Sequence, residues 1–221
     1  MDKRTMPRLV CICGPDGTGK TTQARLLVDD LSSIGMKAKY IWLRFSHIIS
    51  LPLLGYMRFV GISKMERHQG GDRIGHHDLW GRPLLSRIYG ICLFLDMYLA
   101  TLARIRTSLA LGYVVVCDRY VVDTIVDIAT NTRRSGYHKT TIGNLILRIA
   151  PRDTKYLVMI SASSILRSRR KDVGLDSMLD DRIREYQAIA SDMDIPLIDV
   201  GNMSIDAVRK RLQLEIEGWE K

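Results

Sequence analysis

A run near the start of the chain combines glycines, a lysine and threonines in an order suited to binding phosphate. It reads Gly14-Pro15-Asp16-Gly17-Thr18-Gly19-Lys20-Thr21, between a β-prone apolar run and a stretch with helical spacing. Glycines let successive backbone N–H groups face one anion, and a helix N-terminus adds partial positive charge. Lys20 is suited to reach the outer phosphates, and the Thr21 hydroxyl to ligate Mg²⁺. The sequence therefore predicts a site for a nucleoside triphosphate with Mg²⁺, formed by Gly14, Asp16, Gly17, Thr18, Gly19, Lys20, Thr21 and Thr22.

A second pair of chemically suited residues, Asp118 and Arg119, ends the apolar run 114–117. A carboxylate at a strand end is where phosphate-loop enzymes organise Mg²⁺, so we expect Asp118 and Thr21 to be the metal residues. Arg119 beside it is placed to grip a second phosphate group. An ordinary helix-capping Asp is the alternative interpretation of Asp118. Two phosphate grips in one crevice favour phosphoryl transfer over hydrolysis.

A basic segment, Arg167-Ser168-Arg169-Arg170-Lys171, follows an apolar run later in the chain. Basic runs are usually solvated surfaces or nucleic-acid patches. Here the run is followed by Gly174 and a polar helical pattern, so a lid over residues 166–176 that closes on phosphates is the favoured interpretation.

The order of the apolar runs predicts an α/β fold. Five short runs without polar alternation are typical of parallel strands covered on both faces, and helical stretches separate them. We therefore predict a P-loop NTPase-type doubly wound parallel sheet of five strands, with helices on both faces, in a single domain over 1–221. The predicted strands are 8–13, 38–43, 113–117, 155–160 and 196–200.

Composition agrees with a compact enzyme. The 221 residues carry a net charge of +9, which suits polyphosphates and nucleic acid equally. The four cysteines lack metal-binding spacing and are expected to be reduced. No signal-like apolar stretch follows Met1, so a cytoplasmic protein is expected. The segment 88–103 is apolar but contains Asp96, and is interpreted as a core helix rather than a membrane span.

The least regular region is 46–83, which leaves the second predicted strand at the ligand-binding edge of the sheet. Its length predicts a functional flap rather than a simple connection. It includes His76-His77-Asp78. We interpret this triplet as a surface or substrate-contacting loop rather than a metal site, because no further ligand has suitable spacing.

These motifs together resemble the thymidylate kinase family of nucleoside monophosphate kinases. The resemblance covers about four-fifths of the chain and fails over 46–83. It rests on motifs that occur in the family's order: the acid Asp16 in the phosphate loop, Leu43-Arg44-Phe45, Asp118-Arg119-Tyr120, the basic segment, Leu197-Ile198-Asp199-Val200 and Ser204-Ile205-Asp206-Ala207-Val208.

The resemblance implies an ATP-dependent kinase that converts dTMP to dTDP, with Mg²⁺. It implies that Asp16 contacts the acceptor sugar, that Arg44 and Arg119 hold the acceptor phosphate, and that Phe94 stacks on the base. Tyr98 stands where the family has a base-reading Arg, and Asp123 where it usually has Ser, so another acceptor stays open. The full acceptor set is Asp16, Arg44, Phe45, Phe94, Tyr98, Arg119, Tyr120 and Asp123.

The same resemblance suggests how charge is supplied to the reaction. Gly17 leaves the phosphate loop neutral where some family members have a basic residue, so we expect lid arginines to act instead. Arg167 and Arg170 are three apart and share a face of a continuing helix, whereas Arg169 would point toward solvent. The expected catalytic residues are Lys20, Asp118, Arg119, Arg167 and Arg170.

Partners are expected to be ATP and a nucleoside monophosphate, without nucleic acid or membrane. The long third helix, which includes the segment 88–103, is apolar nearly all round and must be buried on more than one side. Members of the family that the chain resembles commonly pair their subunits through this helix, so we expect a homodimer. Two alternatives stay open beside the nucleoside monophosphate kinase. One is a related kinase with a different small-molecule acceptor, and the other is a nucleotide-dependent ATPase or switch. Charge alone suggests a nucleic-acid-binding module.

Overall fold

The computed structural model describes residues 7–44, 47–67, 73–169, 173 and 176–217. Phe45 and Arg170, which the sequence analysis assigns to the site, lie outside these ranges, as does part of the expected lid.

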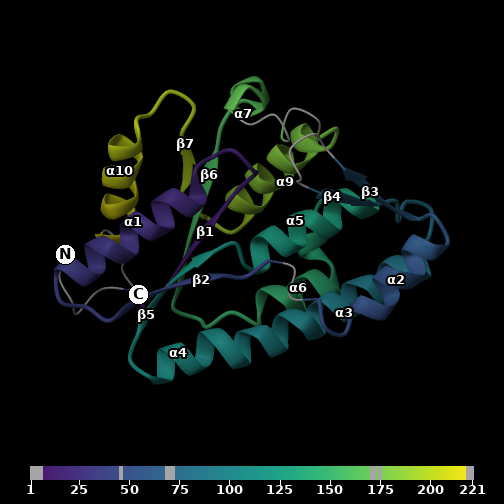
Figure 1. The fold of residues 1–221 in the computed structure, drawn as a ribbon, viewed down its shortest axis with the longest axis horizontal. Coiled ribbons are helices and arrows are strands. Elements are labelled where there is room, and N and C mark those ends of the chain that lie inside the picture. Colours follow the sequence, from purple (N-terminus) through teal and green to yellow (C-terminus); the bar gives the residue numbers. More distant parts are fainter. Residues whose placement is uncertain (1–6, 45–46, 68–72, 170–172, 174–175, 218–221) are drawn as a thin grey trace.

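A five-stranded parallel sheet forms the centre of the molecule (Figure 1). Its order is β2-β5-β1-β6-β7, and every neighbouring pair is parallel. The predicted doubly wound sheet is therefore confirmed, with all five strands close to their expected places. The strands are β1 (Leu9–Cys13), β2 (Ala38–Trp42), β5 (Val114–Asp118), β6 (Thr154–Ile160) and β7 (Leu197–Asp199).

Helices cover both faces of the sheet, and alternate side chains of β1 serve the two layers of core. Val10 and Ile12 pack in the layer that includes Leu27 of α1 and Leu212 of α10. Leu9, Cys11 and Cys13 point the other way, toward α3, α5 and α9. This explains the absence of polar alternation in the strands. The helices named here are α1 (Lys20–Ser33), α3 (Pro83–Ala100), α5 (Val121–Thr132), α9 (Leu179–Asp192) and α10 (Ile205–Glu217).

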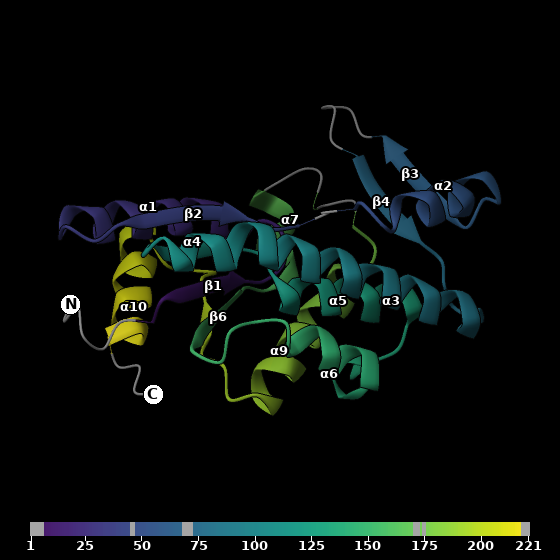
Figure 2. The same cartoon turned by 90° about the horizontal axis from the view of Figure 1, so that it is seen from below.

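Region 46–83 is more regular than predicted. It contains helix α2 (Leu51–Phe59) and an antiparallel pair, β3 (Ser63–Arg67) with β4 (Arg73–His77). These elements lie together at one end of the molecule, away from α1 and α10 (Figure 2). That this region acts as a functional flap stays a prediction. His77 of the triplet packs edge-on against Tyr89, and its Nδ1 lies 2.9 Å from the Ser63 hydroxyl.

Asp96 explains how α2 is held. Its side chain is buried on α3 and accepts hydrogen bonds from the backbone N–H groups of Ile48, Ile49 and Ser50, at 2.6–3.1 Å. Three amides at a helix N-terminus thus meet a carboxylate, which is the favourable sign for the helix dipole. The capping residue is 46 to 48 residues away in sequence, so local pattern does not reveal it.

The third helix is continuous from Pro83 to Ala110, because α3 is followed by a π-helical stretch, Thr101–Arg106, and by α4, Thr107–Ala110. By length and composition alone it is long enough and apolar enough to cross a membrane, with 44% of its most apolar window buried. The expected core helix is therefore buried on only one face. The opposite face exposes Leu84, Ile88, Ile91, Leu95, Leu99 and Leu102.

Three shorter helical segments complete the described fold. Segments η2 (Tyr137–Lys139) and α6 (Thr141–Leu147) connect α5 to β6 and pack beside α3. Helix α7 (Ser163–Arg169) follows β6 and starts the predicted lid segment. Leu166 of α7 packs with Val173 and with Leu179 of α9, so the described part of the lid has a small core of its own.

Candidate active site

The predicted phosphate loop connects β1 to α1, where backbone geometry requires glycine. Gly14 has φ 139°, and a Cβ there would collide with the backbone of Met159 on β6. Gly17 has φ 88°, and its added Cβ would lie 3.4 Å from the carbonyl oxygen of Leu166 on α7. Both φ values are ones that L residues rarely adopt. The loop therefore passes close to both β6 and the base of the lid.

Lys20 is held by the loop itself. Its side chain is buried, and Nζ donates to the Pro15 carbonyl at 2.6 Å. Burial, together with the positive charge of Arg119, lowers the pKa of the Lys20 ammonium to about 8, while nearby carboxylates including Asp16 act in the opposite direction. An amine this confined is placed to respond strongly to phosphate charge.

Asp118, the expected magnesium residue, lies at the end of β5 beside the phosphate loop. The register of β1 with β5 sets Ile12 opposite Asp118, which brings the strand end beside the loop. The Thr21 hydroxyl donates to Oδ2 of Asp118 at 2.5 Å, and the Tyr40 hydroxyl donates to the same oxygen at 2.9 Å. Oδ1 of Asp118 is buried without a hydrogen-bond partner among the described residues.

This pair of residues fits Mg²⁺. A buried carboxylate oxygen without a donor suits a cation, and a hydroxyl with one carboxylate is a common protein share of a Mg²⁺ site. Within the described ranges, no group of three or more His, Cys, Asp or Glu side chains gathers in a metal-binding arrangement. Phosphate oxygens and waters would have to complete the coordination, as Mg²⁺ prefers.

Arg119 is held in a strained conformation. Its φ is 67°, in the left-handed region, and its backbone N–H donates to the Ile12 carbonyl at 3.1 Å. Such strain in a non-glycine residue is often associated with function. The guanidinium forms ion pairs with Asp16 of the loop and with Asp123, the latter at 3.5 Å. The strained backbone thus aims Arg119 at the phosphate loop.

Arg44 adds a second cation beside the phosphate loop. Its Nη1 lies 3.2 Å from Asp16, so Arg44 and Arg119 share this carboxylate. Burial alone would raise the pKa of Asp16, but the charges of Arg119, Lys20 and Arg44 hold that pKa well below its usual range. The structure thus brings together Lys20, Asp16, Arg44 and Arg119, the residues predicted for donor and acceptor phosphates.

Two functional candidates were missed by the sequence analysis. Asp127 accepts from Nε and Nη2 of Arg44 at 3.3 and 3.2 Å, and also pairs with Arg182 of α9. Arg182 in turn pairs with Asp176 at 3.2 Å. Asp127 is one helical turn beyond Asp123, a spacing that offered a clue. Arg182 is 55 residues further along, and its pairing needs the fold.

Two predicted acceptor residues have structural partners instead of open surfaces. Tyr120 lies fully in the core, with its hydroxyl 2.8 Å from that of Thr101. Asp123 is buried, accepts from Tyr186 at 2.7 Å and from the Tyr120 N–H at 3.1 Å. The expectation that these two side chains touch an acceptor stays a prediction. Asp123 orients Arg119, and Tyr120 anchors the strand end in the core.

The two aromatic candidates of the third helix lie side by side. The rings of Phe94 and Tyr98 are stacked, with centroids 6.3 Å apart and an angle of 22° between planes. Phe94 is half-buried against the core, whereas 45% of Tyr98 is exposed. Tyr98 thus lies one helical turn from Phe94, at the position where the family that the chain resembles has an arginine.

The arginines of the lid have different partners. Arg167 forms an exposed ion pair with Asp180 at 3.1 Å. Arg169 donates to the carbonyls of Val200 and Gly201, at 3.0 and 2.9 Å, so it fastens α7 to the turn after β7. The expectation that Arg169 would point only to solvent is corrected by these bonds. Helix α7 is described as far as Arg169, and Arg170 lies outside the described residues, so the shared face of Arg167 and Arg170 stays a prediction.

The chain was compared with protein-family models and with curated proteins. No protein-family model matches the chain. A search of curated proteins finds no match either. Any assignment of family or activity therefore rests on the residues of the crevice. Chemically, the arrangement offers a glycine loop with a lysine for one phosphate group, a carboxylate suited to Mg²⁺, and two arginines for a second anion.

Proposed function

We propose that this chain is a cytoplasmic, Mg²⁺- and ATP-dependent kinase of the nucleoside monophosphate kinase type, with dTMP as the first acceptor to test. One observation carries the proposal. Arg44 and Arg119 converge on Asp16, a residue of the phosphate loop itself, so the crevice has cationic groups for two phosphates side by side. A hydrolase or a switch needs only the groups that bind the nucleoside triphosphate, and not a second set for an acceptor phosphate.

In this proposal each residue has a limited task. The loop amides and Lys20 bind the outer phosphates of ATP, and Arg44 and Arg119 align the acceptor phosphate for in-line attack. Thr21 and Asp118 would hold Mg²⁺, which would neutralise charge on the donor phosphates. Little covalent help is needed, because phosphoryl transfer depends mainly on positioning and positive charge.

In this proposal Asp16 separates the arginines that bind the acceptor phosphate from the loop that binds the donor phosphates. Its carboxylate pairs with both acceptor arginines and sits beside Lys20 in the loop. It can therefore keep Arg44 and Arg119 from turning onto the donor phosphates, and its free acceptor capacity suits an acceptor hydroxyl. Arg167 and Arg170 of the lid would bring the remaining charge when the segment closes.

The experiment is an ADP-release assay with ATP, Mg²⁺ and each nucleoside monophosphate in turn. We expect release that depends on one acceptor and is lost in Lys20→Ala. Sugar phosphates and other phosphorylated small molecules form the second panel. Release at the same rate whether or not any acceptor is present would contradict a kinase and support an ATPase.

A related kinase with a different phosphorylated acceptor is the second candidate. The contact that favours it is the Asp127 carboxylate shared by Arg44 and Arg182, on the face of α5 next to Asp123. A charged network beside the acceptor grip suits a polar acceptor body as well as a pyrimidine ring. The acceptor panel separates the two candidates, because dTMP would then be inactive while a non-nucleotide phosphate is turned over.

A homodimer through the third helix is part of the proposal. The exposed apolar face of this helix, from Leu84 to Leu102, follows the heptad-like spacing of a helix-packing seam. Contiguous apolar surface of this kind marks interaction sites in soluble proteins.

A further inference from the structure

A cavity lies away from the phosphate loop. It has a volume of about 630 Å³ and lies between the first turns of α3, the C-terminal end of α5 and the η2–α6 segment. Arg119 precedes α5, and this cavity is at the far end of that helix, whose 12 residues span about 18 Å. Its lining includes Arg82, Arg87, Arg134 and Lys139 but no Asp or Glu.

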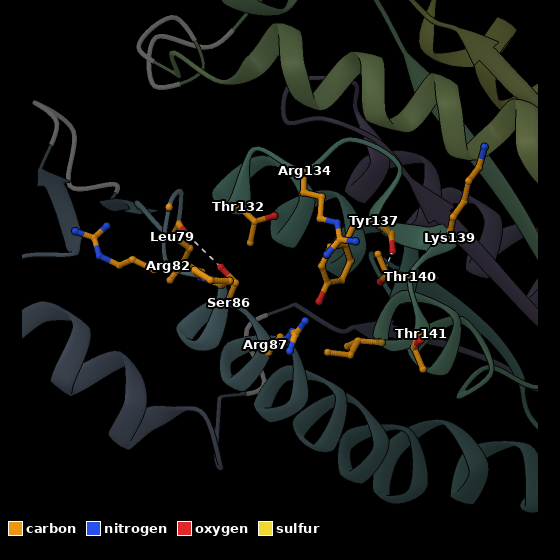
Figure 3. A pocket seen from close by; sticks show the side chains of 13 residues that line it. Leu79, Arg82, Ser86, Arg87, Thr132, Arg134, Tyr137, Lys139, Thr140 and Thr141 are labelled. Carbon is orange, nitrogen blue, oxygen red and sulfur yellow. Dashed lines mark hydrogen bonds between the residues drawn. The ribbon is translucent and has the colours of Figure 1, made fainter.

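Two of these cations point into the cavity and two point away (Figure 3). Arg87 from α3 and Arg134 from the segment after α5 extend into the same space. Arg82 instead donates to the Asp78 carbonyl at 2.7 Å, and Lys139 pairs with Asp192 at 2.7 Å. Over the described ranges, no carboxylate forms an ion pair with Arg87 or Arg134. Two guanidinium groups thus face one cavity without a protein anion to balance them.

A buried hydroxyl is placed beside these guanidinium groups. The Tyr137 ring is 4% exposed and is wedged against α3 at Gly90, where an added Cβ would lie 2.5 Å from the phenol oxygen. The hydroxyl points into the same space as Arg87 and Arg134 (Figure 3). Burial raises the pKa of Tyr137, with Arg134 acting in the opposite direction, so the phenol keeps its proton near neutral pH and is available as a donor.

We propose that this cavity binds the phosphate group of a small organic phosphate, held by Arg87, Arg134 and the Tyr137 hydroxyl. Guanidinium groups match the geometry and the double charge of a phosphate monoester. The cavity is much larger than phosphate alone and falls in the size range of small-molecule sites, so the body that carries the phosphate fits inside. The phosphate can come from a soluble metabolite or from a lipid headgroup at a membrane surface. This site does not depend on the proposed kinase activity.

The first arm of the test uses glycerol phosphate as the soluble probe, measured by titration calorimetry. We expect Arg87→Ala and Arg134→Ala each to weaken binding about 10- to 100-fold, because each removes charge-assisted hydrogen bonds. Arg148→Ala removes the same charge from an exposed residue that directly follows α6 and is expected to bind as wild type. Lys20→Ala reports binding at the phosphate loop and is also expected to leave this affinity unchanged. Thermal unfolding of every variant checks the fold.

The second arm uses vesicles of phosphatidylcholine with and without phosphatidic acid, in a sedimentation assay. Sedimentation that needs phosphatidic acid and is lost in Arg87→Ala and Arg134→Ala, but not in Arg148→Ala, would support the site and identify the lipid source. The proposal is overturned if the two cavity variants match wild type in both arms, or if neither probe binds wild type. It is also overturned if Arg148→Ala weakens binding as much as Arg134→Ala, because general surface charge would then explain it.

Discussion

The Nζ of Lys20 lies 2.6 Å from the carbonyl oxygen of Pro15, so the catalytic candidate is held within its own loop. Its contacts are polar, and it contributes little to the apolar core. We expect Lys20→Ala to lower turnover by about 10²–10³-fold, as for the loss of one electrostatic donor at a reacting group. The circular dichroism spectrum and melting temperature are expected to stay near wild type. Full activity in this variant would refute the assignment of the phosphate loop.

The lowered pKa of Lys20 predicts a pH dependence of nucleotide binding. Phosphates bind the protonated amine, and the free protein loses that proton as pH rises through about 8. The affinity for a non-hydrolysable ATP analogue is therefore expected to be flat below pH 8. Above it, affinity is expected to fall by up to about tenfold per pH unit. Binding titrations with the ATP analogue across this pH range test whether affinity begins to fall near pH 8. The affinity of Lys20→Met should not show this change. A flat profile in wild type would contradict the assigned environment of Lys20.

Removing Asp127 is expected to destabilise the protein and to misplace Arg44. The side chains of Arg44 and Arg182 are only 17% and 11% exposed, so Asp127→Ala leaves two nearly buried cations without their shared carboxylate. We expect a loss of about 3 kcal/mol in the free energy of unfolding, measured with denaturant, and a raised KM for the acceptor. Asp181→Ala, which breaks only the exposed pair with Arg184, is the control and should cost at most about 1 kcal/mol.

Substitution of the two described lid arginines, Arg167 and Arg169, is expected to affect kcat to different degrees. Arg167 pairs with Asp180 at the exposed surface of the lid segment, and in the proposed mechanism it turns onto the transferring group when the segment closes, so Arg167→Ala should lower kcat by up to about 10³–10⁵-fold with little change in ATP affinity. Arg169 fastens α7 to Val200 and Gly201, so Arg169→Ala should have a mild effect. Steady-state kinetics on the identified acceptor decide. Near wild-type kcat in Arg167→Ala and in Arg170→Ala would exclude the lid-arginine mechanism.

Mass in solution tests the apolar face of the third helix. We expect light scattering at micromolar concentration to give a dimer, and Leu95→Glu to give a monomer, because it puts a charge in the centre of that face. Leu214→Glu, the same change at an exposed leucine of α10, is the control and should stay dimeric. A monomeric wild type would show that this face has another role.

The sheet could be predicted because its strands are buried on both faces, which leaves a short, uninterrupted apolar run for each. The turn from β1 into α1 could be predicted because its backbone needs glycine at positions such as Gly14, where the chain passes close to Met159. Both signals are local in sequence. Asp118 and Arg119 could be located in the same way, because they mark the end of the apolar run that forms β5.

What the sequence did not reveal depends on contacts between distant residues. Helix α2 rests on Asp96, which the apolar pattern of α3 presents only as an interruption. Arg182 lies on a polar helix face and becomes a crevice residue only because α9 packs against α5. Tyr120 looks like an acceptor residue by its place beside Arg119, but it is the N-cap residue of α5 and its side chain lies in the core.

Phosphorus NMR of ATP, Mg²⁺ and the protein, with and without dTMP, tests the two-grip crevice most directly, because it follows every phosphate at once. The account predicts that the dTMP resonance is replaced by the coupled pair of a diphosphate, that ADP forms in equal amount and that no inorganic phosphate accumulates. If dTMP is inert, the same result is expected with another phosphorylated acceptor. Inorganic phosphate that accumulates at one rate with or without acceptors, and no diphosphate product, would contradict it.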